Sequence, residues 1–218
     1  MSKMSHPFVP PSFAAVDAIL GEVIGRWHGH EDRIGDWAAA VATLPCRHPE
    51  GWAMTVETLQ LINTFQWHEE DRSRDHAADD RILASVKRSI DASNRRRVQT
   101  VDKLDDLVFT GLNELGALRP DAPLHSESPG SIIDRLSVLA LKVYHVREAM
   151  TELEPGSAEA AAMQPRLDTL TEQSADLGAC LDTLLADIRG GRHGLKLYRQ
   201  VKVYRDPQTG KLLADLDQ

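Results

Sequence analysis

The chain has 218 residues, which is long enough for one core of substantial size, and 42% of its residues are hydrophobic. Its 25 lysines and arginines and 33 aspartates and glutamates give a formal net charge of −8, which argues against a large nonspecific contact with nucleic acid. The two cysteines, Cys46 and Cys180, form no CxxC pair, so neither a disulfide framework nor a four-cysteine zinc site is expected.

A membrane partner is not expected either. No apolar run approaches the roughly 20 residues that span a bilayer, and residues 1–12 lack the apolar core of a secretory signal. We therefore predict a cytoplasmic protein that uses neither nucleic acid nor a membrane as a partner. A homodimer is the assembly that we consider for it.

Apolar residues at helical spacing predict about six helices. The first follows Ser12, a good N-cap residue, and the fifth starts at Ser128-Pro129, with serine at the cap and proline at the first helical position. In chain order the helices are expected at about residues 12–27, 32–43, from 51 to an ambiguous end at 73–79, from there to 118, from 128 to before Pro155, and 157–189.

The hydrophobic period changes after Gly190-Gly191. Val201 and Val203 alternate with polar residues, and the stretch from Asp206 to Gly210 is rich in turn residues, so a small hairpin is predicted. We expect an all-α, single-domain bundle with this C-terminal β-hairpin. Its parts are an N-terminal tail at 1–11, a helical domain at 12–193, and the hairpin and tail at 194–218.

The third predicted helix carries the most informative stripe of the chain. At helical spacing, Asn63, Trp67, Glu70 and Arg74 continue the face of Leu59, and such polar groups are costly to bury unpaired. Carboxylates projecting inward from facing helices can hold Mg²⁺. The metal site predicted on this basis consists of Glu70, Asp71, Glu127 and Asp134. The alternative is that these acids are solvated or paired with nearby arginines.

The fourth and fifth predicted helices supply the other polar groups. Lys87, Asp91 and Asn94 share one helical face that can meet a phosphate or a sugar, and residues 126–131 open a helix with free backbone amides. The predicted substrate-binding residues are Asn63, Trp67, Arg74, Lys87, Asn94, Ser126, Arg135, Lys142 and Tyr198. Ordinary surface ion pairs are the competing interpretation of these charges.

Two histidines each follow a large aromatic residue. His68 follows Trp67, His145 follows Tyr144, and each imidazole is a candidate general base or ligand. A histidine beside an aromatic ring is more often a satisfied core residue. The predicted catalytic residues are His68, His145 and Asp91.

Five ordered blocks between about residues 55 and 207 resemble a known family. They are Asn63-x3-Trp67-His68-x-Glu70-Asp71-x2-Arg74, Lys87-x2-Ile90-Asp91-x2-Asn94-x2-Arg97, Ser126 to Ser137, Leu141-Lys142-x-Tyr144-His145, and Tyr198 to Pro207. The chain is similar to the bacterial family called domain of unknown function 4254. That resemblance implies a helical protein without a settled activity.

We expect from the residues a metal-dependent enzyme that uses Mg²⁺ and binds a phosphorylated small molecule, hydrolysing a nucleotide or sugar-nucleotide phosphoanhydride. One alternative is a non-catalytic regulatory or scaffold module with a buried ion-pair network, in which Arg74 and Arg135 pair with the acids assigned to the metal. Another is a metal-free enzyme that uses His68 or His145 as a base on a sugar or nucleoside.

Overall fold

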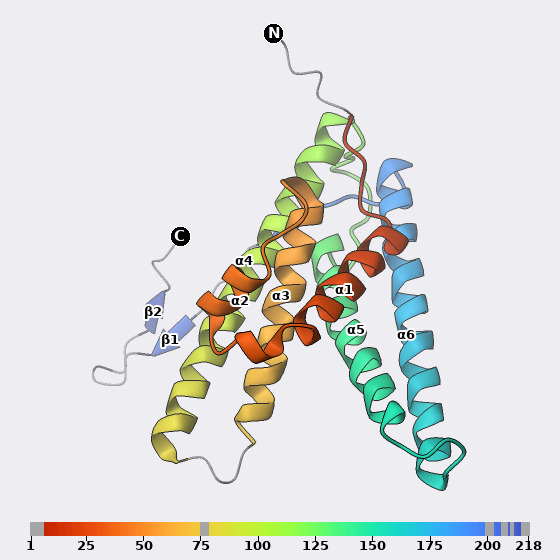
Figure 1. Ribbon diagram of the computed structural model, residues 1–218. Coiled ribbons are helices and arrows are strands. Elements are labelled where there is room, and N and C mark those ends of the chain that lie inside the picture. Colours follow the sequence, from red (N-terminus) through yellow and green to blue (C-terminus); the bar gives the residue numbers. More distant parts are fainter. Residues whose placement is uncertain (1–6, 75–78, 199–202, 206–208, 210–211, 215–218) are drawn as a thin grey trace.

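The computed structural model describes residues 7–74, 79–198, 203–205, 209 and 212–214. Apart from one short strand pair near the end, the described residues fold as α-helices, of which there are six; Figure 1 shows how they are arranged. The helices are α1 (Phe13–His28), α2 (Trp37–Thr43), α3 (Gly51–Arg72), α4 (Asp80–Glu114), α5 (Pro129–Thr151) and α6 (Ala158–Arg189), and a short 3-10 helix, η1 (Glu31–Arg33), follows α1.

Side-chain caps define where several helices begin. Ser12 accepts a hydrogen bond from the Ala15 amide at the start of α1, and Ser128 caps α5 in a capping box that it completes with Ser131. The caps predicted at these two serines are therefore confirmed. Asp36, Asp79 and Ser157 cap α2, α4 and α6 in the same way.

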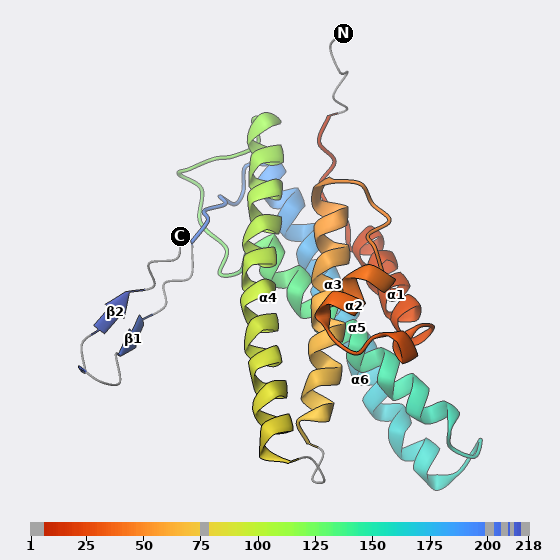
Figure 2. The ribbon, with the colours of Figure 1, turned by 60° about the vertical axis from the view of Figure 1, so that its left-hand side comes forward.

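The helices pack in two antiparallel pairs that α1 joins. Helix α3 packs against α4 and α5 against α6, while α1 crosses the molecule in contact with α3, α5 and α6. Figure 2 shows α3 and α4 side by side, with α5 and α6 behind them. The fully buried residues Leu20, Leu59, Leu104, Ile132 and Leu181 come from five different helices, so all of these helices share one core.

The start of α1 is anchored on α6. The Phe13 amide donates to Oδ1 of Asp182 over 2.8 Å, and the Phe13 ring lies directly over Gly178. A Cβ at Gly178 would be 2.3 Å from the ring, so only glycine permits this close approach. This contact sets the direction in which α1 crosses α3 and α5.

A buried carboxyl group holds the start of α5. Asp105 of α4 is 7% exposed and accepts hydrogen bonds from the Gly130 amide (2.7 Å) and the Ser128 hydroxyl (2.6 Å). Burial raises the pKa of Asp105, and the nearby Asp102 and Asp106 raise it further, while the two hydrogen bonds oppose the shift.

Two three-residue strands follow the helical body, β1 (Val203–Arg205) and β2 (Leu212–Ala214). They pair antiparallel, with Val203 opposite Ala214 and Arg205 opposite Leu212. Most of the predicted turn, at 206–208 and 210, lies outside the described residues. None of the helices described is both long and apolar enough to cross a membrane.

Candidate metal centre

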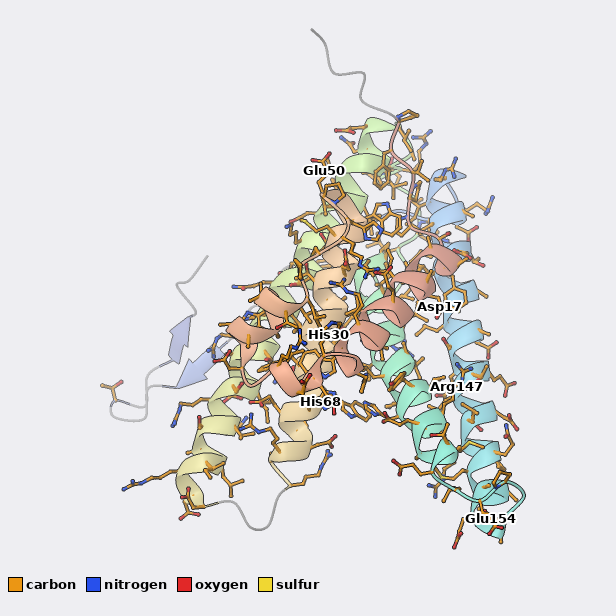
Figure 3. The ribbon with its side chains drawn as sticks, in the orientation of Figure 1. Asp17, His30, Glu50, His68, Arg147 and Glu154 are labelled. Carbon is orange, nitrogen blue, oxygen red and sulfur yellow. The ribbon has the colours of Figure 1, made fainter. Side chains whose placement is uncertain are left out.

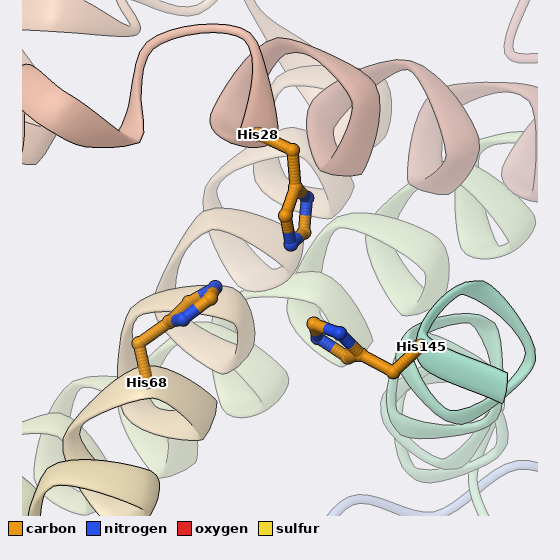
Figure 4. Close-up of side chains that lie close together, drawn as sticks. All are labelled: His28, His68 and His145. Carbon is orange, nitrogen blue, oxygen red and sulfur yellow. The ribbon is translucent and has the colours of Figure 1, made fainter. Parts of the chain in front are cut away.

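Three imidazoles from three helices converge where α1 crosses α3 and α5. His28 is the last residue of α1, His68 lies on α3 and His145 on α5, and Figure 4 shows their rings pointing toward one another. One ligand atom from each histidine lies within 4.8 Å of the other two. Within the described part of the chain, no other group of three or more His, Cys, Asp or Glu residues has this spacing.

Hydrogen bonds at the far side of two rings identify the atoms that face the centre. Nδ1 of His28 lies 2.9 Å from the Ile24 carbonyl oxygen, and Nδ1 of His145 lies 3.1 Å from Oε2 of Glu148. These oxygens can only accept, so each Nδ1 carries a proton, and in the neutral form of each ring the lone pair lies on Nε2. The Nε2 atoms of all three histidines are buried and have no hydrogen-bond partner in the protein.

The surroundings of the third histidine favour its neutral form. Burial lowers the pKa of His68, and the neighbouring His28 and His145 lower it further, while Glu31 and Asp71 oppose the shift. A neutral imidazole is the form that binds metal ions. His68 is therefore ready to act as a ligand near neutral pH.

Aromatic rings stack on the three imidazoles and fix their orientation. Trp27 stacks on His68 with ring centroids 5.2 Å apart, and Tyr144 stacks on His28 at 4.2 Å. Trp67 stacks on His145 at 4.9 Å, with an angle of 9° between the planes. Trp67, which we predicted to bind substrate, thus supports a candidate ligand instead. Packing of this kind holds rings in one rotamer and organises a site before it binds.

Comparison with known proteins identifies the family. The model of the family described as a protein of unknown function, DUF4254, matches residues 53–197, about two thirds of the chain. The chain belongs to the DUF4254 family. No curated protein and no solved structure matches the chain.

The segment that matches DUF4254 includes His68 and His145, whereas His28 precedes it. His28 was not predicted from the sequence, although the sequence holds a signal for it. Trp27-His28 repeats the aromatic-histidine pair seen at Trp67-His68 and Tyr144-His145. Three such pairs on three apolar helical stripes are the pattern that could have found the whole cluster.

The four acids predicted to bind magnesium do not come together among the described residues. Asp134 accepts two hydrogen bonds of 2.7 Å from Arg97, while Glu127 pairs with Arg135 at 2.8 Å. Asp71 pairs with Arg74 at 2.6 Å, and Glu70 joins no metal-ligand group among the described residues. Guanidinium groups thus pair with three of these carboxylates separately.

Two predicted substrate-binding residues, Asn63 and Asn94, belong to a polar layer between α3, α4 and α5. Asn63 donates to Oδ1 of Asp134 (3.1 Å) and to the Ser137 hydroxyl (2.8 Å), and Gln66 donates to Asn94 over 3.0 Å. Farther out on α4, Lys87 and Asp91 pair with each other at 2.5 Å on the exposed surface. Asp91, a predicted catalytic residue, therefore lies outside the histidine cluster.

The remaining predicted residues line two cavities beside this polar layer. A cavity of about 730 Å³ between α5 and α6 is bordered by Ser126, Glu127, Arg135 and Lys142. Tyr198, which is 71% exposed, borders a second cavity with Asn94 and Asp134. Arg97 borders both. Part of the predicted set thus lies around the Arg97–Asp134 pair: Asn63, Asn94, Ser126, Glu127, Arg135, Lys142 and Tyr198. His68, His145 and Trp67 belong instead to the histidine cluster and its stacked rings, and Arg74, Lys87 and Asp91 form exposed pairs elsewhere.

Proposed function

We propose that this member of DUF4254 is a metal-dependent enzyme whose ion is bound by Nε2 of His28, His68 and His145. The observation that carries the proposal is the convergence of three buried nitrogen atoms that have no hydrogen-bond partner. Three protein ligands leave the fourth position of a tetrahedral ion open for water or substrate, which is the arrangement of catalytic zinc sites.

The alternative of a purely structural histidine cluster is unfavourable on energetic grounds. A buried polar atom without a partner costs about 1–3 kcal/mol, and here three such atoms face one another. In the neutral rings of His28 and His145 two of these atoms carry lone pairs, because Nδ1 holds the proton. A cation at the centre would convert this mutual repulsion into coordination.

The ligands favour a transition-metal ion over the Mg²⁺ expected from the sequence. Imidazole nitrogen suits zinc, copper, iron and nickel, whereas Mg²⁺ prefers oxygen ligands. The Ile24 carbonyl and the Glu148 carboxylate occupy the outer positions that usually orient metal-binding histidines. In a tetrahedral zinc site the nitrogen atoms would be about 3.3 Å apart, so the side chains would move inward slightly from the separations of up to 4.8 Å.

The reaction class that we propose is hydrolysis. Zinc held by three histidines lowers the pKa of its bound water to about 7 and so supplies a nucleophile at neutral pH. A phosphorylated small molecule, such as a nucleotide or sugar nucleotide, remains the proposed substrate. The cytoplasmic location remains part of the proposal, in keeping with the two exposed free cysteines, Cys46 and Cys180.

A non-catalytic helical module is the second candidate. The pairs that this hypothesis requires, Arg74 with Asp71 and Arg135 with Glu127, are both present, although they lie at the surface and not in a buried network. In that case the histidine cluster would act as a metal clamp that joins α1 to α3 and α5. Metal binding without any hydrolytic activity would favour this candidate.

A metal-free enzyme that uses a histidine base is the third candidate, and removal of metal with a chelator distinguishes it from the other two. His68, with its lowered pKa, is the group that such an enzyme would use. Activity that persists after dialysis against a chelator, and after loss of the bound ion is verified, would favour this reading over the metal centre.

Metal content measured by plasma mass spectrometry tests the proposal directly. The purified chain should retain close to one equivalent of a transition metal after dialysis, and the His28→Ala, His68→Ala and His145→Ala variants should each lose it. His30→Gln is the matched control, because His30 Nδ1 also bonds a carbonyl four residues back but lies outside the cluster. Circular dichroism of each variant separates loss of the ion from loss of the fold. Absence of metal binding by the folded wild-type chain would refute the proposal.

A further inference from the structure

We propose that a cavity between α1, α5 and α6 is the substrate pocket of the histidine centre and that it accepts a small organic anion with an apolar body. This inference rests on the proposed function. The cavity has a volume of about 390 Å³, and its walls include Gly21 and Ile24 of α1 and Val143, Tyr144 and Arg147 of α5. That volume lies in the range of small-molecule pockets, about 300–1,000 Å³.

The cavity adjoins the histidine centre through two of its wall residues. Tyr144 borders the cavity, and its ring stacks on the His28 ring at 4.2 Å. Ile24 also borders it, and the Ile24 carbonyl accepts the hydrogen bond from His28 Nδ1. On α1, Gly21, Ile24 and His28 follow one another at helical spacing on one stripe, with about 10 Å of rise from the first to the last. None of the three histidines lines the cavity, but two of its wall residues, Tyr144 and Ile24, contact His28.

The charges around the cavity define the chemistry of its ligand. Arg147 is exposed on the α5 wall and, within the described residues, forms no ion pair in the protein. A guanidinium group in this state binds phosphate or carboxylate through two parallel hydrogen bonds. Phe13, Ile24 and Val143 offer apolar surface to the rest of the ligand.

A carboxylate on the opposite wall, that of Asp17, indicates how the ligand is oriented in the cavity. Figure 3 shows Asp17 on α1 and Arg147 on α5, and both border the cavity. Asp17 lies 11 residues before His28, about 16 Å along the helix, whereas Arg147 lies one turn beyond Tyr144. Because Asp17 repels an anion at its own end, the anionic group is expected beside Arg147, the end nearer the histidines.

Filling the cavity tests whether it is a binding site. Gly21 borders it, and a Cβ at this position meets no atom within 4 Å, so Gly21→Leu should fill the space without a clash. Gly25→Leu is the matched control, because Gly25 lies one turn away on the same helix, is equally open, and does not border the cavity. Phenyl phosphate and phenylacetate, titrated calorimetrically into the protein with and without added zinc, serve as the probes.

We expect Gly21→Leu to weaken binding of the anionic probes at least about tenfold and Gly25→Leu to leave it unchanged. Arg147→Gln should weaken the binding of both anions by about 10- to 100-fold, because a charge-assisted hydrogen bond is lost. Binding of neutral benzyl alcohol should change little. Arg88→Gln removes the same charge from an exposed site on α4 and is the control. A larger loss for phenyl phosphate than for phenylacetate identifies a phosphate ligand, and the reverse identifies a carboxylate.

Zinc affinity, measured in parallel by chelator competition, separates the two proposals. Probe binding that depends on Gly21 and Arg147, with zinc affinity unchanged in both variants, supports the pocket. Zinc binding by a protein whose probe affinities are unaffected by Gly21→Leu and Arg147→Gln overturns the pocket and leaves the metal centre standing. A chain that binds no zinc but whose probe binding responds to both substitutions loses the proposed function and keeps the anion pocket.

Discussion

Nδ1 of His145 and Oε2 of Glu148 lie 3.1 Å apart, one helical turn from each other on α5. The carboxylate accepts the Nδ1 proton and so directs the Nε2 lone pair of His145 toward His28 and His68. Glu148 is therefore a positioning residue, and it acts on the metal centre through the histidine.

Glu148→Gln should weaken zinc binding by about 10- to 100-fold, as loss of an outer partner usually does. Competition with a chromophoric chelator measures the affinity. Glu152→Gln, an exposed change one turn further along, should have no effect. Equal zinc affinities for the Glu148→Gln and wild-type proteins would show that Glu148 does not orient His145.

The pH dependence of stability should report the buried carboxyl group of Asp105. The pKa of Asp105 in the folded state is raised above the ordinary value of 3.8. The contribution of Asp105 to the free energy of unfolding is therefore largest below pH 3.8, and it is lost as pH rises through the raised pKa. The free energy of unfolding of the Asp105→Asn variant should therefore gain on the wild type as pH rises from about 4. Urea unfolding at several pH values measures this, and exposed Asp121→Asn is the control. A constant difference between Asp105→Asn and wild type would contradict the shift.

The Arg97–Asp134 pair should contribute to stability more than the exposed pairs do. The Arg97 and Asp134 side chains are 29% and 16% exposed, and Arg97→Gln would leave a largely covered carboxylate without its partner. We expect a loss of about 2 kcal/mol in the free energy of unfolding. Arg135→Gln breaks a more exposed pair and should cost under about 1 kcal/mol. Equal losses in denaturant unfolding would show that burial of the pair has no energetic consequence.

The Phe13–Gly178 contact should control both stability and the metal centre, because it sets the course of α1. Gly178→Ala places a Cβ 2.3 Å from the Phe13 ring, which should cost about 1–3 kcal/mol and weaken zinc binding by shifting His28. Gly25→Ala meets no atom within 4 Å and should stabilise α1 by up to about 1 kcal/mol. Thermal unfolding and chelator competition check the two effects. Unchanged zinc affinity in a destabilised Gly178→Ala variant would show that the packing of α1 on α6 does not affect the metal centre.

The sequence by itself determined the six helices, because apolar spacing and capping residues act within a few positions along the chain. Ser12 and Ser128 cap the helices that they were predicted to cap. The Asp71–Arg74 pair is local in the same sense, since its partners are three residues apart on one helix. Membership of DUF4254 was also recognisable from ordered polar blocks.

Only the tertiary structure decided which distant groups meet. Asp134 is bound by Arg97 of another helix, 37 positions away, which removes it from the expected magnesium site. His28, His68 and His145 converge because α1 crosses α3 and α5 at one point, and the packing of Phe13 on Gly178 helps to set that crossing. Helical periodicity identifies the face on which a residue lies, but the partner of that face depends on how whole helices pack.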